Sequence, residues 1–434
     1  MRQVNLDNAA STPPLRSVLD AVTAFLPSYG SVHRGTGYRS RVSTAAFEQA
    51  RDTVGRFVGA DPDRDVVVFT KNTTEAINRL AATMPFPRDA VVVTTMLEHH
   101  SNDLPWRHRA AGVVHVRATP HGALDMDDLA ARLDHLRGRV ALVAVTGASN
   151  VTGVVQPIHE VAELAHRAGA RVFVDAAQLA PHRPLAMRPH GDPGHLDAVA
   201  FSAHKMYAPF GTGALVADRS MFGHRPDHPG GGTVAAVTLA DVVWAGLPDR
   251  EEGGTPNVVG AVALAAAIEA LTEVGLDRLA EHELALARYA TARLAAVPGL
   301  TIHGPTAADK VGVIPFSLAG LDHALVAAVL ADEHGIGVRS GCFCAHPYVA
   351  HLLGLDDAAA ATWARRVGAG ALRGAPGLVR LSLGGYSNRD DVDRAVAAIH
   401  AVAAGEIRGW YDEQPDGSFV LRCGRPALPA RFAG

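Results

Sequence analysis

Cysteine is scarce in this sequence. The chain has 434 residues but only three cysteines. A small, odd number of cysteines argues against a secreted protein held together by disulfides, and it is typical of a reducing compartment in which thiols stay free. We therefore expect a soluble protein of the cytoplasm.

An excess of basic charge and a long apolar run are also missing. The chain carries 40 Lys and Arg against 44 Asp and Glu, so it has no overall positive field to attract nucleic acid or anionic membranes. Its first residues, MRQVNLDNAASTPP, contain no apolar core of a secretion signal. The most apolar stretch, residues 260–275, contains Glu269 and Glu273 and is shorter than the roughly 20 residues that cross a bilayer. We expect neither a nucleic-acid partner nor a membrane span.

Apolar residues are abundant, at 48% of the chain, and many of them form short runs of Val, Ala and Phe. The runs are continuous rather than alternating, which is typical of strands buried on both faces of a mostly parallel sheet. Helical patterns lie between several of them, at residues 73–84, 126–136 and 157–169, and this alternation predicts an α/β domain. The runs are residues 65–70, 90–95, 139–146, 171–177, 197–202 and 213–218.

The pattern changes after about residue 256, where strands become fewer and helices longer. This change predicts a second, smaller α+β domain, followed by an irregular tail over residues 406–434. The expected elements are helical structure over 258–296, strands near 311–318, 336–339 and 378–384, and helices over 323–335 and 389–405.

Polar side chains follow several of the predicted strands. In open α/β sheets, ligands bind beyond the carboxyl ends of the strands. Asn72, Thr73 and Thr74 open the helix after the first run, where free backbone N–H groups favour a phosphate, although the threonines are also typical helix caps. His99 and His100 follow the second run and, taken alone, are more typical of surface or packed histidines.

Asp175 and Lys205 are harder to explain as packing residues. Asp175 ends an apolar strand, where a charge without a partner is very costly. Lys205 follows another apolar strand, and a buried lysine loses its proton readily and forms Schiff bases. A lysine, a carboxylate and a phosphate site at one edge of a sheet suggest pyridoxal 5′-phosphate (PLP), whose aldehyde, pyridinium nitrogen and phosphate need these partners.

Ten segments give the sequence a specific resemblance. They occur in the order found in the cysteine desulfurase/selenocysteine lyase family of class V PLP-dependent aminotransferase-fold enzymes, which the chain resembles over most of its length. The segments are LDNAAST (6–12), SVHRGTG (31–37), TTEAIN (73–78), EHHSN (98–102), SNVTG (149–153), VDAAQLAPH (174–182), FSAHKMYAPFGTG (201–213), GGGT (230–233), EGGTPN (252–257) and RSGCFCAHP (339–347).

The resemblance implies the PLP-dependent transferase fold of the aspartate-aminotransferase type. This is an α/β fold with a large, mostly parallel sheet domain and a small α+β domain. The large PLP-binding domain would span residues 15–257, and the small domain would combine residues 1–14 with 258–405 and carry the cysteine loop. Thr255 would reach the phosphate bound by the other subunit, which implies a homodimer.

Roles for individual residues follow from the resemblance alone. Lys205 would be the Schiff-base lysine and the acid/base at the substrate Cα, and His99 would stack on the cofactor ring and act in catalysis by shuttling protons. Asp175 would pair with the pyridine nitrogen, and Arg380 would grip the substrate carboxylate as a bidentate guanidinium. The implied cofactor-binding residues are Thr73, Thr74, His99, Asn150, Asp175, Gln178, Ser202, His204, Lys205 and Thr255, and the implied substrate-binding residues are Arg380, Asn150, His33 and Arg339.

Cys342 and Cys344 lie one residue apart, and the residues alone leave three interpretations open. A metal site would have only His346 as a third ligand, without a second cluster at metal-site spacing. A redox pair would lack the C-x-x-C pattern, and two small packed loop residues are the remaining choice. The resemblance favours Cys344, which stands at the family's nucleophile position in Arg-x-Gly-x-x-Cys-Ala-x-Pro, and it implies no metal.

The implied activity is the conversion of L-cysteine to L-alanine, with a persulfide formed on Cys344 and passed to a sulfur-acceptor protein. Residues 350–377, between the cysteine loop and Arg380, predict an added helix and loop beside this site. A PLP-dependent C–S lyase, aminotransferase or epimerase acting on another amino acid therefore stays open, as does a non-catalytic PLP-fold scaffold.

Overall fold

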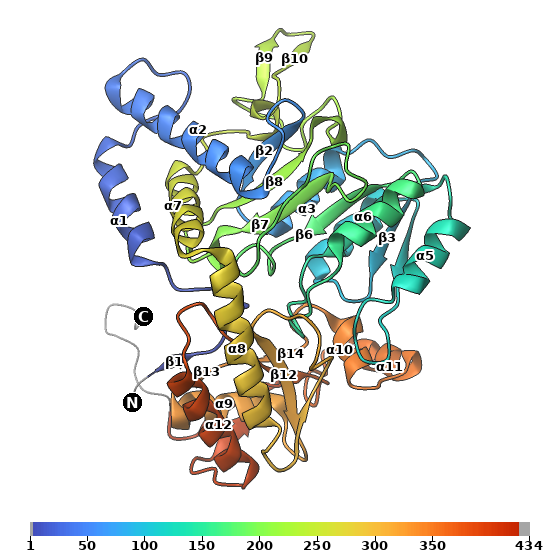
Figure 1. The fold of residues 1–434 in the computed structure, drawn as a ribbon, viewed down its shortest axis with the longest axis vertical. Coiled ribbons are helices and arrows are strands. Elements are labelled where there is room, and N and C mark those ends of the chain that lie inside the picture. The colour runs from blue at the N-terminus through green and yellow to red at the C-terminus, as the bar shows by residue number, and fades with distance from the viewer. Residues whose placement is uncertain (1–2, 425–434) are drawn as a thin grey trace.

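A computed structural model describes residues 3–424 and contains a sheet of seven strands (Figure 1). The strand order is β2-β8-β7-β6-β5-β3-β4. β8 runs antiparallel to β2 and β7, and the other neighbouring strands run parallel, so the predicted α/β, mostly parallel sheet is confirmed. The strands are β2 (Asp65–Thr70), β3 (Val91–Thr95), β4 (Gly112–Val116), β5 (Val140–Thr146), β6 (Arg171–Asp175), β7 (Ala198–Ser202) and β8 (Gly213–Asp218).

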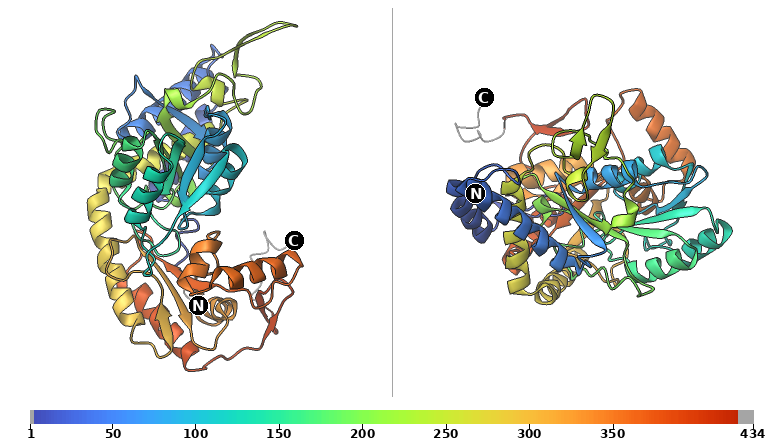
Figure 2. Two further views of the ribbon diagram at one scale, coloured as in Figure 1. Left: turned by 90° about the vertical axis from the view of Figure 1, so that its right-hand side faces the viewer. Right: turned by 90° about the horizontal axis from the view of Figure 1, so that it is seen from above.

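Helices bury both faces of this sheet, which explains the continuous apolar runs (Figures 1 and 2). The helices of this part are α1 (Arg16–Phe25), α2 (Tyr38–Val58), α3 (Thr73–Thr83), α4 (Leu104–Arg109), α5 (Met126–His135), α6 (Ile158–Arg167) and α7 (Val258–Val274). Residues of α3 and α4 share one core cluster with Val66 and Val68 of β2, whereas residues of α5, α6 and α7 share another with Val67. Successive strand residues therefore enter opposite cores, as the two-residue period of a strand requires.

A second sheet has four strands in the order β11-β12-β15-β14, with antiparallel neighbours. Near it, β1 pairs in parallel with β13, which joins the N-terminal segment to the C-terminal half of the chain. A separate core cluster, which includes Val4 and Leu6, supports the proposed small domain, whose boundaries stay a prediction. The elements are β1 (Val4–Asn5), β11 (Leu300–Ile302), β12 (Val313–Leu318), β13 (Ile336–Gly337), β14 (Arg339–Gly341), β15 (Leu378–Ser382), α8 (Leu276–Leu294), α9 (His323–His334) and α12 (Arg389–Ala403).

The expected helical structure over 258–296 is present as two helices, α7 and α8, whose axes differ by 76°, because Gly275 takes a φ of 89° that favours glycine. The tail is not wholly irregular: β16 (Tyr411–Glu413) and β17 (Phe419–Leu421) form an antiparallel hairpin. Residues 425–434 of the predicted tail lie outside the described residues.

Within the described range no individual helix has the length and apolarity to cross a bilayer. The helices α7 and α8 meet the criterion only when they are taken together as a bent pair, on length and composition alone.

Several short elements lie at the edges of the fold. A hairpin of β9 (Val234–Val237) and β10 (Val242–Trp244) projects from one end of the molecule (Figure 1). The helix expected within 350–377 is α11 (Asp357–Gly368), which follows α10 (His346–Leu352). The short 3-10 helices are η1 (Leu26–Ser28), η2 (His100–Asn102), η3 (Ala203–Lys205), η4 (Arg219–Met221) and η5 (Asp249–Glu251).

Candidate active site

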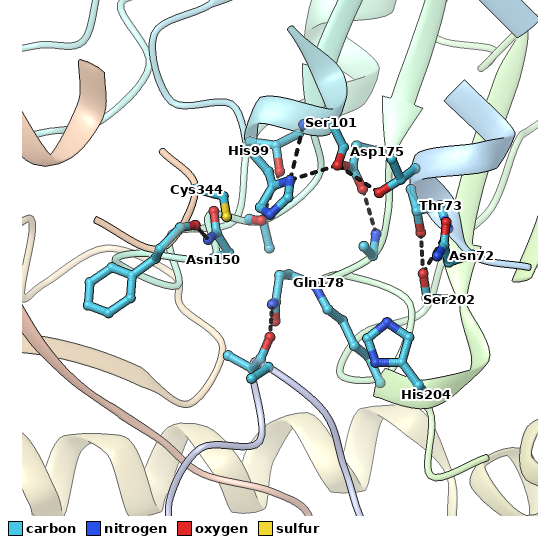
Figure 3. Close-up of a pocket in the computed structure, with 18 of the residues that line it drawn as sticks. Asn72, Thr73, His99, Ser101, Asn150, Asp175, Gln178, Ser202, His204 and Cys344 are labelled. Carbon is cyan, nitrogen blue, oxygen red and sulfur yellow. Dashed lines mark hydrogen bonds between the residues drawn. The ribbon is translucent and has the colours of Figure 1, made fainter. Parts of the chain in front are cut away.

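A cavity of about 330 Å³ opens where the carboxyl ends of β2, β6 and β7 meet β14 and β15 (Figure 3). Its size falls within the range of small-molecule sites. Cys344 lies beside His99 and Asn150 at one end of the view, and Thr73 and Ser202 lie at the other. The lining residues are Ala9, Ala10, Asn72, Thr73, Thr74, His99, Ser101, Thr146, Ala148, Asn150, Asp175, Ala177, Gln178, Ser202, His204, Lys205, Arg339, Phe343, Cys344 and Arg380.

Two of the predicted site residues lie outside this cavity. Thr255 is exposed in the single chain. His33 is also exposed, takes a φ of 71°, and places its Nε2 3.0 Å from a carboxylate oxygen of Glu48. Their roles toward cofactor and substrate stay predictions, because a second subunit is needed to test them.

The start of α3 forms one end of the cavity. Its cap is Asn72, whose Oδ1 accepts a hydrogen bond from the Glu75 N–H at 2.9 Å, so the interpretation of Thr73 or Thr74 as the cap was wrong. The Thr73 N–H donates to Ser202 Oγ at 2.9 Å, and the two hydroxyls lie 2.7 Å apart. A helix start with hydroxyls from two segments suits an anion such as a phosphate.

Asp175 and Lys205 both line the cavity. Burial raises the pKa of the Asp175 carboxyl, while the Ala177 N–H, 3.0 Å from Oδ1, and Lys205 act in the opposite direction. Burial lowers the pKa of Lys205 to about 8, and Arg380 lowers it further, whereas Asp175 raises it. About one-tenth of Lys205 is therefore a neutral amine at pH 7, far more than for an ordinary lysine, and this is the form that reacts with aldehydes.

His99 and His204 are both held in the neutral form. The His99 Nδ1 accepts from the Ser101 N–H at 3.1 Å, which places the ring proton on Nε2. Burial lowers the pKa of His99 to about 3, with a further contribution from Lys205. Burial also lowers the pKa of His204 to about 4, again reinforced by Lys205. Neither imidazole therefore adds positive charge beside the lysine.

Glu98, a buried neighbour of His99 that does not line the cavity, is a residue to which the sequence assigned no role. Its Oε1 accepts from Thr95 Oγ1 at 2.6 Å and from the Thr146 N–H at 3.0 Å, and its Oε2 accepts from Asn102 Nδ2 at 2.7 Å. Burial raises the pKa of Glu98 to about 8. The carboxyl joins the segment that carries His99 to the end of β5. The sequence feature that could have indicated this role is the acidic residue at the start of the EHHSN segment.

The cysteine loop is held against the cavity by contacts to both sheets. The Phe343 carbonyl accepts from Asn150 Nδ2 at 2.7 Å, and the Cys344 carbonyl accepts from the His100 N–H at 2.7 Å. Arg380 lies over the Phe343 ring at 4.8 Å. Phe343 and Cys344 take φ values of 52° and 54°, a left-handed conformation that is uncommon outside glycine and that turns the exposed Cys344 toward the cavity.

The two neighbouring cysteines occupy different environments. Cys342 Sγ donates to the Pro376 carbonyl at 3.0 Å, and its side chain packs against the main core. Burial raises the pKa of Cys342 to about 11, so it stays a thiol near neutral pH. Cys344 is exposed, and both cysteines are free. The contrast favours packing as the role of Cys342.

Asp7 connects the two arginines of the site, a role that was not predicted from LDNAAST. Arg380 is 2% exposed, donates from Nη2 to Asp7 Oδ1 at 3.1 Å and from Nη1 to the Asn150 carbonyl at 2.8 Å, and has a pKa that burial lowers to about 10. Arg339 donates from Nε and Nη2 to Asp7 Oδ2 at 3.0 and 2.9 Å. Among the described residues, the buried Arg380 Nε has no hydrogen-bond partner.

Comparisons with known proteins agree with this geometry. A sequence model of the family described as Aminotransferase class-V matches residues 4–395. The cysteine desulfurase of Haloferax volcanii is 36% identical over 410 residues, covering 92% of this chain and 89% of the relative. That of Dickeya dadantii is 37% identical over 408 residues, covering 92% and 91%.

Solved structures show the same similarity. The apo cysteine desulfurase from Thermococcus onnurineus NA1 has a TM-score of 0.81 at 31% identity, covering 93% of this chain and 95% of that one. The cysteine desulfurase CsdA from Escherichia coli, in an S-sulfonic acid form, has a TM-score of 0.78 at 29% identity, covering 94% and 96%. This chain therefore belongs to the class-V aminotransferase family and has the fold of its cysteine desulfurases.

Proposed function

We propose that this protein is a PLP-dependent cysteine desulfurase that converts L-cysteine to L-alanine and takes the sulfur as a persulfide on Cys344. The observation that carries the proposal is a single cavity lined by Lys205, Asp175 and the exposed thiol of Cys344. The cysteine desulfurase relatives, which match over nine-tenths of the chain, support it.

The residues of the cavity fit PLP. Asp175 provides a buried carboxylate for the pyridine nitrogen, and the start of α3 with Ser202 provides donors for the phosphate. Gln178 donates from Nε2 to the Ala9 carbonyl at 2.6 Å, and its buried Oε1 has no partner among the described residues, so it is available to a hydroxyl of the cofactor. When bound, PLP supplies an electron sink for the bonds at the substrate Cα.

Three residues of the protein have separate roles in the reaction. The neutral Lys205 amine takes the proton from the substrate Cα, and the guanidinium of Arg380 orients the substrate carboxylate once Asp7 yields part of its contact. The Cys344 thiolate attacks the substrate sulfur, so an S–S bond forms as the C–S bond breaks. The electron pair of the broken bond goes to Cβ, which gains a proton and becomes a methyl group, and Lys205 returns a proton to Cα to complete L-alanine.

A product assay with L-cysteine tests this function against the alternatives. We expect alanine, with sulfide released when a reducing thiol is present. Pyruvate with ammonia would instead identify a C–S lyase, a keto acid an aminotransferase, and D-cysteine an epimerase. A protein that binds no PLP would be a scaffold, and one that binds PLP but leaves L-cysteine unchanged would point to another amino acid as the substrate. The exposed position of Cys344 supports transfer to a sulfur-acceptor protein, and the cytoplasmic location stays a prediction.

The rate at which the apoprotein takes up PLP should depend on pH in a way that reveals the pKa of Lys205. Because its pKa is lowered to about 8, about half of the amine is neutral at that pH and about nine-tenths of it one pH unit higher. We expect the rate of cofactor uptake, followed by visible absorbance, to rise with pH and level off above about pH 8–9. The reaction of PLP with N-acetyl-lysine is the control and should keep rising toward about pH 10. A protein curve that follows the control would contradict the lowered pKa.

We also propose a homodimer with shared active sites, supported by the exposed apolar hairpin of β9 and β10. Val237, Leu239 and Val243 are 61%, 111% and 56% exposed in the single chain. A large exposed apolar patch of this kind is typical of an interface. Together with the exposed Thr255 and His33, it suggests that a second subunit covers this end of the molecule.

The variant Leu239→Asp/Val243→Asp is expected to weaken the dimer, because it places charges in an apolar contact. Light scattering should give twice the 45.4 kDa chain mass for the wild type and a shift toward the single-chain mass for the variant. Val420→Asp, in the tail hairpin, is the matched control and should leave the mass unchanged. A variant that stays dimeric, or a monomeric wild type, would overturn the assignment.

A further inference from the structure

A cluster of two histidines and an aspartate lies far from the cavity. Asp65 begins β2, and His190 and His195 belong to the segment between β6 and β7. One ligand atom from each residue lies within 4.8 Å of the others. β2 ends near the cavity, so the cluster lies at the opposite edge of the large sheet, roughly 17 Å away along a strand of this length.

His195 presents a lone pair that no described residue uses. Its side chain is buried, with 3% of the residue exposed. The Nδ1 lies 2.7 Å from the Arg188 carbonyl, which fixes the ring proton on Nδ1 and leaves Nε2 as an acceptor. Nε2 is buried without a hydrogen-bond partner in the described part of the chain. A buried unpaired polar atom is costly, and this pattern is typical of a histidine prepared for a metal.

Asp65 and His190 lie against this free nitrogen. His190 Nε2 is 2.9 Å from Asp65 Oδ1, and both side chains are at most 5% exposed. Asp65 Oδ2 accepts from the Asp61 N–H at 2.8 Å, and no Lys or Arg among the described residues pairs with the carboxylate. The imidazole centroids of His190 and His195 are 4.1 Å apart. A hydrogen bond between Asp65 and His190 explains one contact of the cluster but leaves His195 Nε2 unexplained.

We propose that Asp65, His190 and His195 bind a zinc ion through one carboxylate oxygen and two imidazole nitrogens. Such a mixed N and O set suits Zn²⁺, with water as the fourth ligand. Ligand atoms around tetrahedral zinc are about 3.4 Å apart. The three ligand atoms here lie within 4.8 Å of one another, so small rotations of the side chains would bring them to that separation. Asp218 Oδ2 lies 3.6 Å from His190 Nδ1, where a carboxylate orients a metal-bound histidine.

Neighbouring charges support the assignment of Asp65 as a metal ligand and of Asp218 as the carboxylate that orients His190. Arg171 Nη1 lies 3.6 Å from Asp218 Oδ2, and Arg64 Nη2 lies 4.0 Å from it, so Asp218 is already partly neutralised. Asp65 has no such Lys or Arg partner among the described residues, so its carboxylate is left for the ion. The zinc would join the start of β2 to the segment that runs from Asp175, at the end of β6, to the strand before Lys205. The ion would lie at a distance from the cavity and would take no part in the reaction at Lys205.

Zinc binding by the untagged holoenzyme tests the site. After treatment with EDTA, equilibrium dialysis against ZnCl₂ should give one tightly bound zinc per chain in the wild type. His195→Gln and His190→Gln should weaken this binding by about tenfold or more. His166→Gln, a nearby histidine outside the cluster, and Cys344→Ser, which removes the reactive thiol, are the controls and should bind as the wild type does.

Cobalt provides a second readout. Co²⁺ bound to the wild type should give the visible absorption of a four-coordinate N and O site, and this absorption should be lost in both cluster variants. The wild-type spectrum decides the question even if a variant does not fold. A wild type that binds no zinc, or cluster variants that bind zinc as tightly as the wild type, would overturn the proposal.

Discussion

Replacement of Lys205 by methionine is expected to remove the visible absorption of bound PLP and to lower alanine formation from L-cysteine by roughly 100- to 10,000-fold. Methionine keeps most of the length and apolar volume of lysine but has no amine. The loss would follow from the lowered pKa of Lys205, which makes its amine both a nucleophile for the cofactor aldehyde and a base for the Cα proton. Absorbance and a timed alanine assay measure the two effects.

Lys310 offers a matched control. It is also buried, at 6% exposure, and burial also lowers its pKa to about 8, but it lies outside the cavity. Lys310→Met should therefore keep the absorption band and at least about half of the activity, because it touches no reacting group. If Lys205→Met retained alanine formation close to the wild-type rate, Lys205 would not be the acid/base.

Cys344→Ser is expected to lower alanine formation by roughly 100-fold or more, since removal of a nucleophile costs orders of magnitude in other enzymes. PLP absorption should persist, because Cys344 lies at the other end of the cavity from the α3 start. Mass spectrometry of the alkylated protein should find one extra sulfur atom on Cys344 of the wild type after L-cysteine is added, and none on the variant.

Cys342→Ser separates the two thiols. Its side chain faces the Pro376 carbonyl and its pKa is raised to about 11 by burial, so it contributes no thiolate near neutral pH. The variant should keep the persulfide on Cys344 and most of the activity, within about threefold of the wild type. Persulfide on Cys342, or full activity in Cys344→Ser, would show that the assignment of the nucleophile was wrong.

Much of the large sheet could be predicted from the sequence, because a strand buried on both faces needs apolar residues in succession. The run DVVVFT coincides with β2, and the run at 213–218 coincides with β8. β4 was missed because its sequence, GVVHV, contains a histidine and therefore makes no continuous apolar run. A histidine is tolerated there because most residues of β4 are only half-buried. The break at Gly275 was missed because the Ala-rich residues on both sides favour helix so strongly.

The residues of the candidate site that could be predicted from the residues alone are those whose charge conflicts with the apolar sequence around them. Asp175 and Lys205 are charged residues beside apolar strands, and such conflicts are visible in one sequence. Asp7 and Glu98 gave no comparable signal, because their partners are remote: Asp7 meets Arg380 across 373 positions, and Glu98 meets Thr146 across 48. Burial and hydrogen bonding there depend on how the two sheets come together.

By itself, the sequence determined most of the succession of strands and helices and the cofactor class it is suited to, because periodicity and charged residues beside apolar strands are local features, whereas the choice of Cys344 in RSGCFCAHP rests on the family resemblance and stays a prediction. Only the tertiary structure decided which thiol faces the cavity, that His99 holds its proton on Nε2, and that Asp7 joins Arg339 to Arg380. It also brought Asp65 next to His190 and His195. These features arise from contacts between segments far apart in the chain, and their energies depend on burial that the packed fold alone creates.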